Sequence, residues 1–228
     1  MPDKGYLISL IDNLTLVALI CITAILLIKK GWDNKLLFFI GVNALYSISL
    51  FLLGYFYDME SSQYGVFSNL TMHIDTLSGF GFFYFLWDDK AFRKFLTLSI
   101  LPVLVTWLLT LVFRGIYKTP YWNLMLPSLW FLLAAVYAML LLYRKSQFNE
   151  GAIYTSKFLL IAGFLFYNFI YLVIETCYLF VTSMHSITDA WNINYWGYFI
   201  FRLLMLAGIL SWYFAGNTLR ANLATVRK

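Results

Sequence analysis

Apolar residues fill seven stretches of the chain, and each stretch is about as long as a helix that crosses a bilayer. About 20 helical residues cover the roughly 30 Å of hydrocarbon in a membrane. The stretches lack the strict alternation of apolar and polar residues that marks a membrane β-strand, and a helix satisfies its own backbone hydrogen bonds in lipid. The pattern therefore predicts an all-α integral membrane protein, a seven-transmembrane-helix bundle, with helices at about residues 6–28, 36–57, 64–87, 95–113, 121–143, 158–182 and 193–215.

Composition agrees with this class. Hydrophobic residues make up 62% of the 228 residues and charged residues 12%, against about 45–50% apolar in soluble domains. The seven stretches use nearly the whole sequence, so we expect a single transmembrane domain over residues 1–228. Lys4 precedes the first stretch as in a signal peptide, but Asp12 and Asn13 lie inside it and no small-residue cleavage site follows, so we expect a mature helix.

Basic residues set the expected orientation. When the loops are assigned alternately to two sides, twelve Lys and Arg fall on one side and three on the other. By the positive-inside rule, this places the N-terminus outside and the C-terminus in the cytoplasm. We expect a multi-pass protein of a plasma membrane or a bacterial inner membrane, in contact with the lipid bilayer. The net charge of +5 then reflects topology, and we expect no nucleic-acid partner.

Ionisable residues interrupt the apolar stretches at only a few places. Counting about 1.5 Å per residue from each predicted helix end puts all of them in the outer half of the bilayer. A charged side chain facing lipid at mid-helix costs about 2.5–3.5 kcal/mol, so we expect these groups to face inward and to pair with one another. They are Asp12, His73, Asp75, Glu175 and Arg202.

Polar and aromatic side chains extend this set along the last two predicted helices. Spacings of three and four residues place them on one face of each helix. The sequence therefore predicts a ligand- or ion-binding pocket in the outer half, in which Arg202 pairs with a carboxylate. Its predicted lining is Asp12, His73, Asp75, Asn168, Tyr171, Glu175, Tyr178, Tyr195, Tyr198 and Arg202.

Two features stay outside this predicted pocket. Asn43 falls in the inner half of the second helix, where we expect it to hydrogen-bond to another helix. Residues 183–195 are expected to form the longest outer loop, a candidate lid.

Several chemistries of membrane bundles lack their residues here. A retinal protein needs a lysine in the last helix, and residues 193–216 contain none. His73 and His185 are the two histidines, too few for a three-histidine zinc site, and His185 falls in a predicted loop rather than facing His73 to bind haem. The Pro-Gln pair of seven-helix sugar transporters is also missing. We therefore expect no metal and no cofactor, and favour a binding protein over an enzyme.

The layout of the predicted bundle resembles the seven-helix sensory regions that precede the kinase domain in some bacterial signalling proteins, although no motif is shared. Our leading hypothesis is a sensory or receptor-like protein that binds a small molecule or an ion, with residues 217–228 contacting a signalling partner. One alternative is a structural or assembly subunit of a membrane complex. Another is a small transporter or an intramembrane lipid-modifying enzyme.

Overall fold

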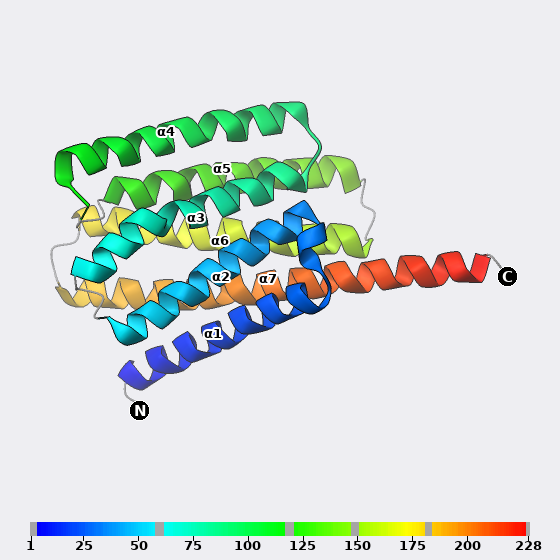
Figure 1. The fold of residues 1–228 in the computed structure, drawn as a ribbon, viewed down its shortest axis with the longest axis horizontal. Coiled ribbons are helices and arrows are strands. Elements are labelled where there is room, and N and C mark those ends of the chain that lie inside the picture. Colours follow the sequence, from blue (N-terminus) through cyan, green and yellow to red (C-terminus); the bar gives the residue numbers. More distant parts are fainter. Residues whose placement is uncertain (1–3, 58–61, 117–120, 147–150, 181–183, 227–228) are drawn as a thin grey trace.

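The computed structural model describes residues 4–57, 62–116, 121–146, 151–180 and 184–226, and the regular elements in these ranges are all helical. The predicted all-α class is therefore confirmed. Figure 1 shows long helices lying side by side in one bundle, with α7 projecting beyond the others towards the C-terminus. The elements are α1 (Lys4–Ile28), η1 (Gly31–Asp33), α2 (Lys35–Phe56), α3 (Ser62–Leu86), α4 (Lys90–Arg114), α5 (Tyr121–Ser146), α6 (Ala152–Phe180) and α7 (Met184–Val226).

Six of these helices are long and apolar enough to cross a membrane, as expected of a multi-pass membrane protein. The exception is α3, whose apolar character is diluted by polar side chains, several of them buried against neighbouring helices, such as Asn69, Thr76 and Ser78. It packs against α2, α4 and α5. The count of seven spans and the orientation of the termini remain predictions.

The bundle exposes apolar side chains and buries charged ones, as expected of a protein surrounded by lipid. Large apolar side chains lie on the outside, among them Phe56 at 80% exposed and Phe113 at 79%, whereas Arg202 and Glu175 are buried. A soluble bundle would place its charges outside and its apolar side chains inside. The apolar outer surface therefore indicates contact with the lipid bilayer.

Several helix ends differ from the sequence prediction. α4 begins at Lys90 rather than near 95, and α6 begins at Ala152 rather than near 158. α7 runs from Met184 to Val226, so the predicted outer loop at residues 183–195 is wrong from Met184 onward. An apolar run marks the part of a helix that faces lipid, whereas the helix itself continues into water wherever the backbone hydrogen bonds continue.

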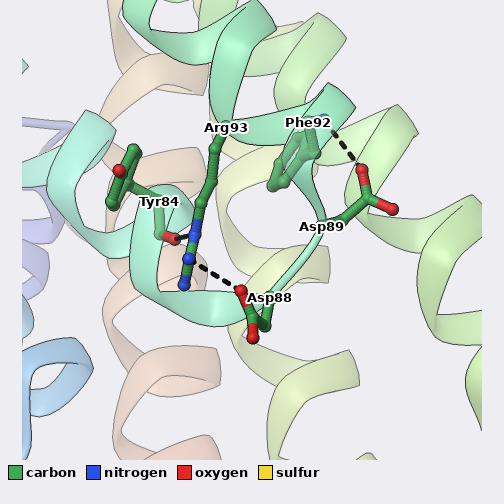
Figure 2. Close-up of polar contacts among 5 residues, drawn as sticks. All are labelled: Tyr84, Asp88, Asp89, Phe92 and Arg93. Atoms are coloured by element: carbon green, nitrogen blue, oxygen red, sulfur yellow. Dashed lines mark hydrogen bonds and ion pairs between the residues drawn. The ribbon is translucent and has the colours of Figure 1, made fainter.

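Side chains fix the turn between α3 and α4 (Figure 2). The Asp89 carboxylate accepts a hydrogen bond from Phe92 N at 2.8 Å and caps the start of α4. Arg93 Nε donates to Tyr84 O at 3.2 Å, and its Nη1 lies 2.7 Å from Asp88 Oδ1. Asp88 is 89% exposed, so the ion pair adds little. The cap and the bond to the α3 carbonyl hold the turn.

The end of the bundle that contains this turn is filled by apolar side chains. Phe82 stacks on Phe164 with 4.8 Å between ring centroids, and Phe83 lies 5.1 Å from the same ring. These rings belong to a continuous buried cluster that also includes Leu26, Leu36, Leu37, Ile40, Leu86, Phe92, Leu96, Leu141, Leu142, Leu160 and Ile161. This apolar end lies on the side predicted to face the cytoplasm.

Lys157 of α6 holds the last turn of α3 at this end. Its Nζ donates to Leu86 O at 3.0 Å and lies 3.8 Å from the centroid of the Trp87 ring. The last carbonyls of a helix have no partner within it, and a positive charge there interacts favourably with the helix dipole. Lys157 thus joins α6 to α3 across the apolar end.

Replacing Lys157 with methionine should lower the free energy of unfolding by about 1–2 kcal/mol, because the Leu86 carbonyl loses a charged donor. A denaturant titration of the purified protein in mixed micelles measures the change. Lys145→Met is the matched control, since Lys145 is exposed and its Nζ lies 5.3 Å from the same ring; its expected change is within about 0.5 kcal/mol. Equal losses in both variants would contradict the role of the Leu86 bond.

Candidate functional site

A cavity of about 650 Å³ opens among the helices in the half of the bundle opposite the apolar end. Its lining comes from α1, α2, α3, α5, α6 and α7. It approaches the helix ends, since Tyr55 lies next to the last residue of α2 and Asn123 lies in the first turn of α5. By the predicted topology, this half is the outer one.

Most of the residues predicted from the sequence meet at this cavity. They come from four helices, α1, α3, α6 and α7, which lie far apart in the sequence. The predicted residues that line the cavity are Asp12, Asp75, Asn168, Tyr171, Tyr195, Tyr198 and Arg202.

His73 faces a different part of the bundle. Its ring lies against Trp107 of α4, with 4.1 Å between the ring centroids, beside a small space also lined by Val103. Neither ring nitrogen has a hydrogen-bond partner in the described chain. Residues two apart on a helix point to different sides, which explains why His73 and Asp75 separate.

Glu175 lies behind the cavity wall. Glu175 is 2% exposed and lies one turn after Tyr171 on α6. It does not belong to the cavity lining, and its Oε2 has no partner within the described ranges. The side chain of Tyr178 lies outside the described residues.

Arg202 forms the centre of a buried hydrogen-bond network. Its Nη1 donates to Asn43 Oδ1 at 2.6 Å, and its Nη2 donates to Ser47 Oγ at 2.6 Å and to Tyr198 OH at 2.7 Å. The guanidinium carbon lies 4.6 Å from the ring centroids of both Tyr198 and Phe201, a cation–π arrangement. The network ties α7 to α2.

The expected ion pair between Arg202 and a carboxylate is absent from the described part of the chain. Asn43 lies between the two groups instead. Its Nδ2 donates to Asp75 Oδ1 at 2.5 Å and to Ser78 Oγ at 3.3 Å, while its Oδ1 accepts from Arg202. One amide therefore connects α2, α3 and α7, and it joins the carboxylate to the guanidinium indirectly.

Asn43 and Ser47 were missed as cavity residues from the sequence. Asn43 is the ninth of the 22 residues of α2, in the half of the helix nearer Lys35 as expected, but it is close enough to mid-helix to line the cavity. Their spacing in the sequence could have identified them, because Asn43 and Ser47 are four residues apart and therefore share a helix face. Its role as a hydrogen bonder between helices is as expected.

Aromatic rings form much of the remaining wall. Tyr167 packs edge-on against Tyr198 at 5.3 Å between centroids and lies parallel to Phe201 at 5.2 Å. Phe51 of α2 stacks on Tyr198 at 6.5 Å. The site thus combines aromatic faces with two carboxylates, those of Asp12 and Asp75, and one guanidinium.

No known protein family, characterised protein or solved structure matches the chain. Evidence on its function therefore comes from the chemistry of the cavity. Within the described ranges, no three His, Cys, Asp or Glu side chains gather closely enough to hold a metal ion. The cavity volume falls in the range of about 300–1,000 Å³ that small-molecule sites occupy.

Proposed function

We propose that this chain is a seven-helix membrane protein that binds a small ligand in the cavity and acts as a sensor or receptor. The observation that carries the proposal is the 650 Å³ cavity, lined by Asp12, Asp75 and Arg202 in a bundle whose outer surface is apolar. Ionisable groups at membrane depth are costly and usually mark a functional site. A cavity beside them supplies the space that a ligand needs.

The packing of the bundle favours binding over transport. A transporter needs a polar path that continues to the other side of the membrane. Here the half opposite the cavity is filled by the apolar cluster around Phe83, Leu86 and Phe92. The cavity therefore ends inside the bundle, as expected of a receptor pocket.

The cavity also favours binding over a purely structural subunit. A scaffold is expected to pack tightly, with its buried arginine paired to a carboxylate. Arg202 is instead bonded to neutral side chains at the cavity wall. α7 carries Arg202 and continues to Val226 beyond the bundle (Figure 1), so we propose its distal part, from residue 217, as the contact for a signalling partner.

Cysteine labelling tests the cavity and the proposed orientation together. Thr76 lines the cavity, whereas its neighbour Leu77 is 45% exposed on the outer surface. Cys21 and Cys177 are both exposed and are first replaced by serine. In intact cells, a membrane-impermeant maleimide should modify Thr76→Cys at least about tenfold faster than Leu77→Cys, because the reactive thiolate forms in water and not in lipid.

The matched pair shares one helix and one depth, so the difference reports the cavity alone. Equal slow labelling of both variants would overturn the proposed water-filled pocket. Labelling of Thr76→Cys only after the cells are opened would instead contradict an outside-facing cavity and so reverse the orientation.

A further inference from the structure

We propose that the ligand of this cavity is a small organic cation, which the free oxygen of the Asp75 carboxylate recognises. The inference rests on the proposed binding function and specifies its ligand class. Some polar atoms at the cavity wall are already hydrogen-bonded to other protein groups, whereas others are free to bind a ligand.

Arg202 has no accessible donor to offer an anion. Each of its two Nη atoms carries two hydrogens, and each donates to two protein partners: Nη1 to Asn43 Oδ1 and Met205 Sδ, and Nη2 to Ser47 Oγ and Tyr198 OH. Nε has no hydrogen-bond partner in the described ranges, but it is buried, and Arg202 as a whole is 1% exposed, so a ligand in the cavity does not reach it. An anionic ligand would find this guanidinium occupied, so Arg202 is a positioning residue.

Asp75, unlike Arg202, has a polar atom that remains available to a ligand. Its Oδ1 accepts from Asn43, which fixes the orientation of the carboxylate. Among the described side chains, the hydrogen bond found for this carboxylate is the one to Oδ1, which leaves Oδ2 available, and the residue is partly exposed at the cavity wall. A carboxylate oxygen only accepts hydrogen bonds, so the available group at this wall suits a donor that carries positive charge.

The half of the bundle that contains the cavity carries more carboxylates than cations, which also favours a cationic ligand. Among the described side chains that line the cavity, Asp12 and Asp75 face a single cation, Arg202, and Glu175 lies buried nearby. The Tyr167 and Tyr198 rings line the same cavity and add aromatic surface against which an apolar group can pack. A cationic head near Asp75 with an apolar body against these rings matches both features.

Three probes of the same shape test the charge preference. They are 2-phenylethylammonium, the neutral 2-phenylethanol and the anionic 3-phenylpropanoate, each used to protect the Thr76→Cys variant from maleimide. The ammonium probe should slow labelling by about tenfold more than the alcohol or the acid, because a charge-assisted bond to a partly buried carboxylate is about twice as strong as a neutral one.

The same assay on Asp75→Asn identifies the recognising group. Asparagine retains the shape and an acceptor for Asn43, but it removes the charge, so protection by the ammonium probe should weaken by about tenfold. Asp33→Asn is the matched control, since Asp33 is exposed in η1 at the other end of the bundle; it should leave protection unchanged.

Each contrary result has its own meaning. Better protection by the acid, equal protection by all three probes, or full protection by the ammonium probe in Asp75→Asn would overturn the cation assignment. So would a reactive Thr76→Cys thiol that the ammonium probe does not protect. A thiol that is unreactive without any probe would overturn the proposed function itself. The comparison of the three probes does not depend on the folding of Asp75→Asn.

Discussion

Replacing Asn43 with alanine should lower the free energy of unfolding by about 2–4 kcal/mol. The substitution removes the acceptor of Arg202 Nη1 and the donor to Asp75 Oδ1, and it leaves a buried guanidinium hydrogen without a partner. Hydrogen bonds to charged groups contribute about 1.5–3 kcal/mol each, and burying an unsatisfied charged group costs more. A reversible denaturant titration in mixed micelles measures the loss.

Ser47→Ala and Ser49→Ala make a matched pair for the same network. Both serines lie on α2 and donate to a carbonyl of their own helix, but Ser47 alone of the two accepts from Arg202 Nη2. We expect Ser47→Ala to cost about 1–2 kcal/mol and Ser49→Ala less than about 0.5 kcal/mol. If Asn43→Ala is as mild as Ser49→Ala, the network does not hold α2, α3 and α7 together.

Replacing Gly81 with alanine should lower the free energy of unfolding by about 1–3 kcal/mol, the usual cost of overpacking. A Cβ at Gly81 would lie 2.6 Å from Cγ of Phe39, within the Phe39 ring's van der Waals contact distance. Because the clash includes the base of the ring, rotation of Phe39 does not relieve it easily. The ring is also stacked on Phe85, with 5.7 Å between centroids. Thermal unfolding in lipid nanodiscs measures the loss.

Gly41→Ala is the control for this substitution. A Cβ at Gly41 meets only Leu26 Cδ1 at 3.5 Å, an ordinary contact, and alanine favours a helix by up to about 1 kcal/mol relative to glycine. We expect Gly41→Ala to be neutral or stabilising. Destabilisation of both variants by the same amount would show that the α2–α3 contact does not require glycine at residue 81.

The fold was largely predictable because lipid imposes a simple rule on the sequence. The apolar stretches located α1, α2, α4, α5, α6 and α7, each of which is apolar enough to span a membrane. The ends of α4, α6 and α7 were not predictable from apolarity, since Lys90 and the residues beyond Phe214 continue their helices as polar extensions. For α3, apolarity alone is a weaker guide to a membrane span, because its buried polar side chains lower its mean hydropathy.

The composition of the cavity was predictable, whereas its connections were not. Depth alone brought Asp12, Asp75 and Arg202 to one level, and the structure places all three at the cavity. The rotation of each helix decides which groups touch, and a uniformly apolar sequence leaves that rotation undefined. This is why the sequence paired Arg202 with a carboxylate, while the structure inserts Asn43 between them.

The length of α7 gives the bundle a mechanical property. It continues for 43 residues and contains no proline, so it extends for about 65 Å, roughly twice the thickness of the hydrocarbon. Arg202 fastens it to α2 at the cavity, and Val226 lies about 36 Å further along the axis. If α7 pivots at that fastening, a tilt of about 5° moves its distal end by about 3 Å, given this length. The helix then acts as a lever that enlarges a small movement at the cavity.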